Sequence, residues 1–179
     1  MIEALISSKT RIKLLMKFFL NSSTTAYLRS LETEFGESSN AIRVELNRLE
    51  GAGLLTSQTR GNKKIFQANA HHPLFKEIHN ILLKQIGLDR IIEQVIERLG
   101  EVEKVYLAGA FSRGLDSPII DLILIGEIDQ SFLIQLIDKV EDLIHRKIRY
   151  LIYSLDEFEA LDQSHFNPLP LLLWLKENK

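Results

Sequence analysis

The sequence predicts an α+β protein with a basic, largely helical first half and an acidic second half in which strands and helices alternate. Three observations support this prediction. Apolar residues recur at helical spacing through much of residues 9–50. Two short strand-like runs then flank Gly61-Asn62, which is typical of a β-hairpin. Beyond residue 100, three apolar strand-like segments are separated by a glycine-containing turn and by a helical segment.

Composition excludes several classes of protein. The chain has 179 residues, of which 45% are hydrophobic and 26% are charged, so it is neither disordered nor fibrous. It contains no cysteine, which rules out disulfides, a thiolate nucleophile and cysteine-ligated metal sites. The longest apolar runs are too short to span a bilayer, and the first residues lack the pattern of a secretory leader. We expect a cytoplasmic protein without membrane contact.

Charge divides the chain near Ala70. Residues 1–70 hold 10 Lys and Arg against 6 Asp and Glu, whereas residues 71–179 hold 12 against 18. Binding to phosphates requires local positive charge and not a basic whole protein. The first part is therefore the candidate for contact with nucleic acid.

Three helices are predicted in the basic part. Gly36 ends the second helix, and the third continues to Glu50 before Gly51-Ala52-Gly53. Short hydroxyl side chains precede each helix and can accept hydrogen bonds from its first backbone N–H groups. These candidate caps are, in chain order, Ser7 or Ser8, Thr24 or Thr25, and Ser38 or Ser39.

The third helix has two different faces. Ile42, Leu46 and Leu49 form an apolar face that predicts burial. On the other side, polar residues recur every four positions and form one stripe. Arginine can pair with guanine, and asparagine with adenine, in a major groove that is wide enough to admit a helix. The stripe consists of Ser39, Arg43 and Asn47, with Asn40 and Arg48 beside it.

The hairpin adds a basic tip, because Arg60, Lys63 and Lys64 surround its turn. The phrases SSNAIRVELNRLEGAGLL and GNKKIFQAN make residues 5–70 resemble a winged helix-turn-helix, in particular the ArsR-like bacterial regulators. The resemblance implies that the third helix enters the major groove of DNA while the hairpin reaches a flanking backbone or the minor groove. The candidate DNA-binding residues are Ser38, Ser39, Asn40, Arg43, Asn47, Arg48, Arg60, Asn62, Lys63 and Lys64.

Two acidic residues, Glu45 and Glu50, also lie on the third helix and would repel phosphate if they faced DNA. Residues 71–100 are expected to form a helical connector. His72-Pro73-Leu74 fits a helix start with proline at the first position. An apolar stripe follows, and a second helix is predicted from Leu88 to Leu99. We expect this stripe to form a homodimer interface; it comprises Phe75, Ile78, Ile81, Leu82 and Ile86.

Residues 101–179 predict a small α/β module. The expected strands are 103–108, 119–125 and 147–153, and an amphipathic helix is expected at 130–144. A short acidic helix should follow at 155–161. We expect the apolar end, Leu171–Leu175, to dock on the same sheet or across a dimer. His71-His72 has no carboxylate or thiol nearby at ligand spacing, and His79, His145 and His165 are isolated from one another, so neither a metal nor a cofactor is predicted.

The segment from Gly109 to Asp121 resembles the minimal nucleotidyltransferase domain of the polymerase-beta-like superfamily. That family uses a Gly-Ser pair for the triphosphate and three carboxylates for two magnesium ions. Here Ala110 replaces the serine and Ile119 replaces the first aspartate. The position where the family has its third carboxylate falls near Arg149, which is a cation. We therefore expect no catalysis. A remaining loop could bind a nucleotide or another anion through Gly109, Ser112, Arg113, Gly114 and Asp121.

Taken with both resemblances, the sequence favours a dimeric, sequence-specific transcriptional regulator that binds double-stranded DNA. Its second half would serve dimerisation, partner contact or sensing of a small molecule or nucleotide. One alternative is a nucleotidyltransferase that a winged helix targets to its substrate. Another is a winged helix that binds protein, as in an antitoxin or a scaffold.

Overall fold

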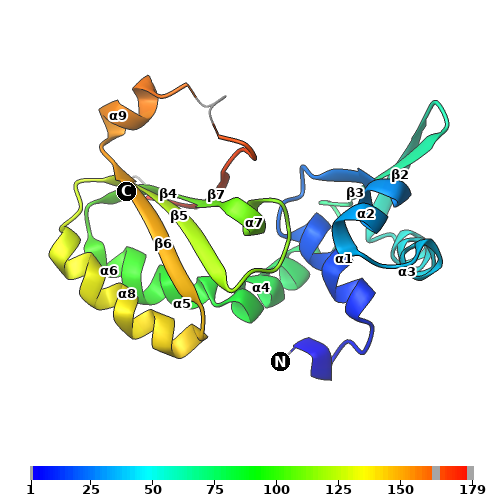
Figure 1. The fold of residues 1–179 in the computed structure, drawn as a ribbon, viewed down its shortest axis with the longest axis horizontal. Helices are drawn as coiled ribbons and strands as arrows, with labels where there is room; N and C mark the ends of the chain where they lie inside the picture. Colours follow the sequence, from blue (N-terminus) through cyan, green and yellow to red (C-terminus); the bar gives the residue numbers. More distant parts are fainter. Residues whose placement is uncertain (1, 163–165, 177–179) are drawn as a thin grey trace. The chain divides into compact units, whose positions relative to one another are not determined.

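The computed structural model describes residues 2–162 and 166–176, and it confirms the α+β class (Figure 1). The chain forms two compact units, Met1–Gln85 and Ile86–Lys179. The boundary falls inside the segment expected to be a connector, so residues 71–85 belong to the first unit and residues 86–100 to the second. No helix of the described chain is both long and apolar enough to cross a membrane.

The first unit begins with a short 3-10 turn, η1 (Ile2–Ala4), and with α1 (Lys9–Phe19). Ser8 caps α1 as predicted, and its hydroxyl accepts a hydrogen bond from the backbone N–H of Arg11 at 3.2 Å. The apolar side of α1 lies in the centre of the unit, with Leu14, Phe18 and Phe19 fully buried. Burial of these three large apolar side chains anchors α1 in the core of the unit.

The second helix starts later than expected. Thr24 and Thr25 do not cap it, because Thr25–Tyr27 form a strand, β1, that pairs antiparallel with β3. The helix α2 therefore spans Leu28–Phe35, and the Ser30 hydroxyl bonds to the backbone N–H and C=O of Tyr27 at its start. Tertiary strand pairing has overridden the local capping signal. Gly36 ends α2 as predicted, in the left-handed conformation with φ of +63°.

The third helix and the hairpin confirm the prediction closely. The helix α3 spans Ser39–Gly51, and the Ser38 hydroxyl caps it by accepting from the N–H of Ala41 at 3.3 Å. The strands β2 (Leu55–Arg60) and β3 (Lys63–Ala68) pair antiparallel and join β1 in a sheet of order β1-β3-β2. Helix, helix and hairpin thus have the winged helix-turn-helix arrangement.

The helix after the hairpin, α4, spans Phe75–Ile86, so its predicted start at Pro73 is wrong. Backbone and side-chain groups of His72 form a separate turn here, in which the ring Nδ1 accepts from the N–H of Leu74. The first part of α4 packs on α1, with the rings of Phe75 and Phe19 5.4 Å apart. Ile81 is 42% exposed, so part of the apolar stripe faces solvent.

The second unit opens with a helix that follows the prediction for 88–99. It is divided into α5 (Leu88–Ile91), a π-helical segment η2 (Ile92–Ile96) and α6 (Glu97–Leu99). The unit also contains α7 (Gly109–Ser112), α8 (Gln130–Ile144) and α9 (Leu155–Ala160). These three follow the predicted turn and the two predicted helices.

A four-stranded sheet of order β6-β5-β4-β7 forms the core of the second unit. Its strands β4 (Val102–Ala108), β5 (Ile119–Gly126) and β6 (Lys147–Tyr153) match the predicted segments. Strands β5 and β6 are parallel and are joined through α8, whereas β4 pairs antiparallel with both of its neighbours. The apolar end forms β7 (Leu171–Leu175), which docks as an edge strand on β4. The docking on the same sheet is confirmed.

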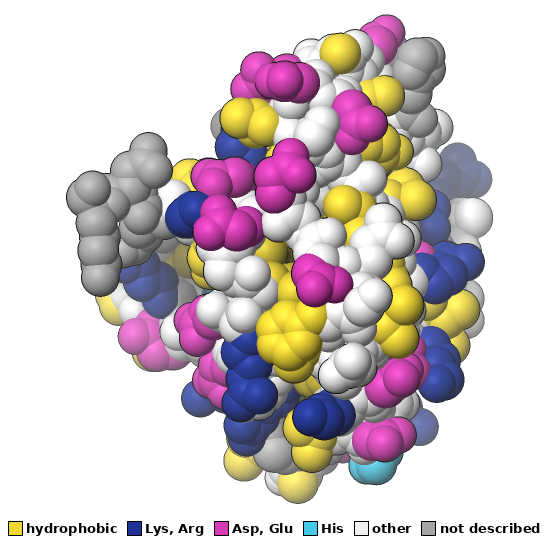
Figure 2. All heavy atoms as spheres, turned by 90° about the vertical axis from the view of Figure 1, so that its left-hand side faces the viewer, with side chains coloured by type: hydrophobic (Ala, Val, Ile, Leu, Met, Phe, Trp, Pro, Cys, Tyr) yellow, Lys and Arg dark blue, Asp and Glu magenta, His cyan; other side chains and the backbone are white. Residues whose placement is uncertain are grey.

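Two helical layers cover this sheet. The helix α8 buries Leu133, Leu136 and Val140 and contacts η2 and α5. On the other face, Phe158 of α9 packs on Ile123 and Ile125 of β5. Acidic, basic and apolar side chains are intermixed on the side where α8 and α9 lie (Figure 2).

Candidate nucleic-acid interface

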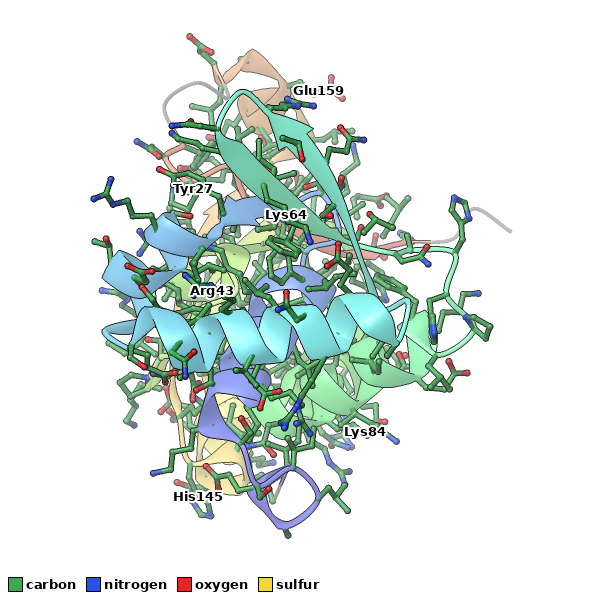
Figure 3. The ribbon with its side chains drawn as sticks, turned by 90° about the vertical axis from the view of Figure 1, so that its right-hand side faces the viewer. Tyr27, Arg43, Lys64, Lys84, His145 and Glu159 are labelled. Atoms are coloured by element: carbon green, nitrogen blue, oxygen red, sulfur yellow. The ribbon has the colours of Figure 1, made fainter. Side chains whose placement is uncertain are left out.

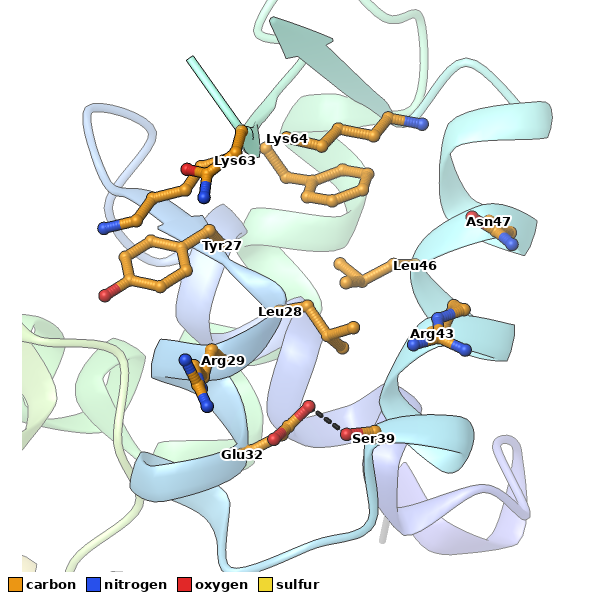
Figure 4. A pocket seen from close by; sticks show the side chains of 12 residues that line it. Tyr27, Leu28, Arg29, Glu32, Ser39, Arg43, Leu46, Asn47, Lys63 and Lys64 are labelled. Atoms are coloured by element: carbon orange, nitrogen blue, oxygen red, sulfur yellow. Dashed lines mark hydrogen bonds between the residues drawn. The ribbon is translucent and has the colours of Figure 1, made fainter. Parts of the chain in front are cut away.

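A groove in the first unit lies between α2, α3 and the β2–β3 hairpin (Figure 4). It brings together six of the ten predicted DNA-binding residues, which come from two separate segments of the sequence. Four cations, Arg29, Arg43, Lys63 and Lys64, line it together with the single carboxylate of Glu32. The complete lining is Tyr27, Leu28, Arg29, Glu32, Ser39, Arg43, Leu46, Asn47, Asn62, Lys63, Lys64 and Phe66.

The orientation of α3 decides which of its side chains face outward. Ile42, Leu46 and Leu49 are buried at 0%, 1% and 4% exposure, so the opposite side of the helix faces solvent. Arg43 and Asn47 are exposed on that side. Figure 3 shows α3 lying lengthwise across this face, with the hairpin beside it and Lys64 above Arg43. Packing of the apolar face therefore presents the predicted polar stripe outward.

The side chains of Arg43 and Asn47 have no polar partner in the part of the chain that the structure describes. Among residues 2–162 and 166–176, Arg43 forms no ion pair and Asn47 forms no side-chain hydrogen bond. Exposed, unpaired groups of these two types are free to bind an external donor or acceptor. This pair is the chemical centre of the candidate interface.

Glu45 does not oppose phosphate, because it faces inward. Glu45 is only 6% exposed. Its Oε2 lies 2.8 Å from Arg11 Nε, and its Oε1 lies 3.2 Å from Arg48 Nη1. Burial acts to raise the pKa of Glu45, but hydrogen bonds from Arg11 and Ser8 and the charges of Arg11 and Arg48 hold it below its ordinary value. Glu45 is thus an internal counterion, and Arg48 is partly committed to it.

Glu50 is the partner of the hairpin. Its carboxylate accepts a hydrogen bond from Lys64 Nζ at 2.6 Å and another from the Ser57 hydroxyl at 2.5 Å. These two hydrogen bonds lower the pKa of Glu50, with the one from Lys64 having the largest effect. Through these two hydrogen bonds, Glu50 joins the end of α3 to both strands of the hairpin, β2 at Ser57 and β3 at Lys64. Lys64 therefore carries less free charge toward DNA than the sequence suggested.

Of the remaining predicted residues, Asn62 is exposed and lines the groove, whereas Ser38, Ser39, Asn40 and Arg60 do not enter it as free groups. Ser38 caps α3, and the hydroxyl of Ser39 donates to Glu32 at the edge of the groove (Figure 4). Asn40 is exposed but outside the groove lining. Arg60 lines a separate depression of the hairpin, with Thr25, Thr56, Ser57, Gln58, Ile65 and Gln67.

Three groove residues from the start of α2 were not predicted: Tyr27, Leu28 and Arg29. The ammonium of Lys63 lies 4.4 Å from the centre of the Tyr27 ring, which is a cation–π geometry. Arg29 stands in the first turn of α2 and is exposed, with no ion pair among the described residues. A predicted start of α2 at Leu28 would have placed Arg29 in the first turn of the helix. A cation is unusual there, because it is unfavourable for the helix dipole.

The candidate ligand loop of the second unit has a different character. Gly109 adopts φ of +63°, and a side chain there would collide with the carboxylate of Asp121. The Ser112 hydroxyl is buried and donates to the carbonyl of Gly109 at 2.9 Å. Arg113 is exposed, and Gly114 is buried with φ of +72°. The loop is closed by internal contacts at Gly109, Ser112 and Asp121.

Asp121 is paired with a cation. It lies opposite Arg149 in the parallel β5–β6 register, and its Oδ1 is 2.7 Å from Arg149 Nε. The hydrogen bond from Arg149 to Asp121 raises the pKa of the guanidinium. In the described part of the chain, no three His, Asp or Glu side chains are grouped so that they could hold a metal ion. The carboxylate of Asp121 is therefore already paired with the charge of a guanidinium group.

Comparisons with known proteins give only distant likenesses. No protein family model matches the chain, and no curated protein matches its sequence. AF1382 from Archaeoglobus fulgidus is a similar solved structure, with 14% identity and a TM-score of 0.38 over 46% of this chain and 93% of that chain. A "putative nucleotidyltransferase" from Sulfolobus solfataricus is 20% identical, with a TM-score of 0.34 over 54% of this chain and 83% of that chain.

A third solved structure is named "Possible transcriptional regulator for arsenical resistance". It is 22% identical, with a TM-score of 0.31 over 50% of this chain and 88% of that chain. Each of the three likenesses covers about half of this chain. At these TM-scores they assign neither a family nor a function to it.

Proposed function

We propose that the first unit binds double-stranded DNA sequence-specifically and that the protein is a transcriptional regulator. The observation that carries this proposal is the groove in which Arg43 and Asn47, both exposed and unpaired, stand beside Lys63 and Arg29. Arginine and asparagine are the side chains that pair bidentately with guanine and adenine in the major groove. Phosphate contacts from the flanking cations would fix the register of α3 on the duplex.

The distribution of acidic groups supports the same function. Glu45 is buried beside Arg11, and Glu50 is occupied by Lys64 and Ser57. The two carboxylates that could repel a phosphate backbone are therefore neutralised inside the unit. Glu32 remains in the groove, where it accepts a hydrogen bond from Ser39. The free charge on this face is positive.

For the second unit we propose a catalytically inactive, nucleotidyltransferase-like module that serves dimerisation, partner contact or ligand sensing. The support is chemical: a two-metal transfer needs several carboxylates, and the only one at the resembling positions, Asp121, is bound by Arg149. Ala110 and Ile119 supply neither a hydroxyl nor a carboxylate. A homodimer remains part of the proposal, with the exposed Ile81 of α4 as a candidate contact.

Fluorescence anisotropy tests the DNA-binding proposal. The full chain is titrated onto duplex DNA from upstream of its own gene and onto random duplex DNA, across a salt series. We expect tighter binding to one sequence and a loss of affinity as salt increases, because cations on DNA release counterions. Arg90→Ala is the matched control, since it removes an exposed arginine from the second unit. Absence of binding to either DNA at low salt would contradict the proposal.

A second assay tests the proposed absence of catalysis. The protein is incubated with each nucleoside triphosphate and Mg²⁺, and pyrophosphate release is measured. We expect no release above the background without protein. Magnesium-dependent release that persists through purification, and that Asp121→Asn abolishes, would show that the second unit is an enzyme.

A further inference from the structure

The outermost stripe of α3 is uncharged. Asn40, Val44 and Asn47 follow one another at intervals of four and three residues, so they lie along one side of the helix. Val44 is 40% exposed, and both asparagines are exposed. Arg43 and Arg48 stand on either side of this stripe. The cations thus flank a strip of two amides and one branched apolar side chain.

Among the described residues, none of the three side chains takes part in a hydrogen bond or in the buried core. Neither the Asn40 nor the Asn47 side chain has a hydrogen-bond partner in residues 2–162 and 166–176. The packing of α3 depends on Ile42, Leu46 and Leu49, and Val44 points away from them. A single exposed valine is ordinary on a protein surface. Val44, however, lies between two unpaired amides on the helix that would enter the major groove, where it can provide an apolar contact to a base edge.

The chemistry of this stripe matches one type of base pair. In the major groove, adenine presents an acceptor at N7 and a donor at N6, which an asparagine amide complements. Thymine presents the C5 methyl group, which is the apolar group of the standard base edges. A strip of amide, methyl and amide groups therefore complements A·T pairs better than G·C pairs, whose edges would leave the valine against polar atoms.

Building on the proposed function, we propose that α3 reads A·T base pairs through this stripe, with Val44 in contact with the C5 methyl of a thymine and Asn47 paired with an adenine. Asn40 would extend the same reading by one contact. Arg43, which faces the groove beside the hairpin, would read a pair next to this A·T segment. Val44 is then a residue that determines specificity and not a neutral surface position.

The test begins with selection of binding sites. The full-length protein selects duplexes from a randomised pool, and each thymine of the selected site is then replaced by deoxyuridine, which lacks only the C5 methyl. For the wild type we expect one replacement to weaken binding about three- to fivefold, the effect of removing one buried methyl contact. Val44→Ala should bind the thymine site more weakly by a similar factor and should not respond to the replacement.

Two further measurements separate the outcomes. Leu5→Ala, which shortens an apolar side chain with 78% exposure outside α3, is the matched control and should keep the wild-type response. Replacement of adenine by 7-deazaadenine should weaken the wild type but not Asn47→Ala. If a site is selected but no deoxyuridine replacement matters, the Val44 reading is overturned while DNA binding stands. If no sequence is enriched above the random pool, the proposed function itself fails.

Discussion

Glu50 at the end of α3 binds Lys64 of β3, with Nζ and Oε2 2.6 Å apart, and so connects the helix to the hairpin. Lys63, the adjacent residue, has no such partner among the described residues and lies over the Tyr27 ring. Two neighbouring lysines of the basic tip therefore have different tasks. Lys64 holds the hairpin against α3, and Lys63 is available to a phosphate.

This difference predicts unequal effects of two similar variants. Lys63→Ala should weaken binding to all DNA sequences alike and reduce the slope of log K against log salt by about one unit, because one phosphate contact is lost. Lys64→Ala should change that slope less, and thermal unfolding should show a small loss of stability, about 0.2–1 kcal/mol for an exposed pair. Equal changes of salt slope in both variants would contradict the assignment.

Glu45 predicts a dependence of stability on pH. Its pKa in the folded protein lies below the ordinary value of 4.5, so its carboxylate stabilises the fold above that pH. This contribution is lost as the pH falls from about 4.5 through the folded value. Glu45→Gln should destabilise the first unit at pH 7 by about 1–3 kcal/mol, because Arg11 loses a charged partner. The difference from the wild type should shrink in thermal unfolding below pH 4.5.

The control for this prediction is Glu93→Gln, which alters an exposed pair with Arg90 at 3.5 Å. We expect its free energy of unfolding to stay within about 0.5 kcal/mol of the wild type at every pH. A Glu45→Gln protein with the same pH profile as the wild type would show that Glu45 is not the internal counterion.

Two glycines predict opposite effects of the same substitution. Gly109→Ala should destabilise the second unit by about 1–3 kcal/mol, because φ is +63° and the new methyl meets the Asp121 carboxylate. Gly51 is the last residue of α3, and a side chain there would meet nothing within 4 Å. Gly51→Ala should therefore be neutral or stabilise the first unit by up to about 1 kcal/mol. Chemical denaturation followed by circular dichroism measures both, and a neutral Gly109→Ala would refute the close contact.

The sequence predicted most elements well where the signals were local. Ser8 and Ser38 cap their helices, and Gly36 and Gly61 take positive φ at the ends of α2 and of β2. It failed where backbone pairing over a long distance decided the structure. Thr25–Tyr27 became a strand because β3, forty residues further on, offers its edge to them.

The candidate site could be predicted only in part, for the same reason. Arg43 and Asn47 follow from helical spacing, since the apolar face of α3 fixes the exposed one. The commitment of Lys64 to Glu50 depends on a contact between segments that spacing cannot reveal. Likewise, Arg29 joins the groove through the packing of α2 against α3. Whether a cation on this face is free or paired depends on contacts with distant segments of the chain, and not on its residue type.

The most direct test of the proposed DNA-binding function is the ratio of affinities for selected and random DNA, measured for wild type and Arg43→Ala at one salt concentration. We predict that Arg43→Ala loses about 1–3 kcal/mol on the selected site and much less on random DNA, so that the ratio falls. The control Arg90→Ala should keep the wild-type ratio. Equal losses by Arg43→Ala on both DNAs would contradict base reading by Arg43 and leave it as a phosphate contact only.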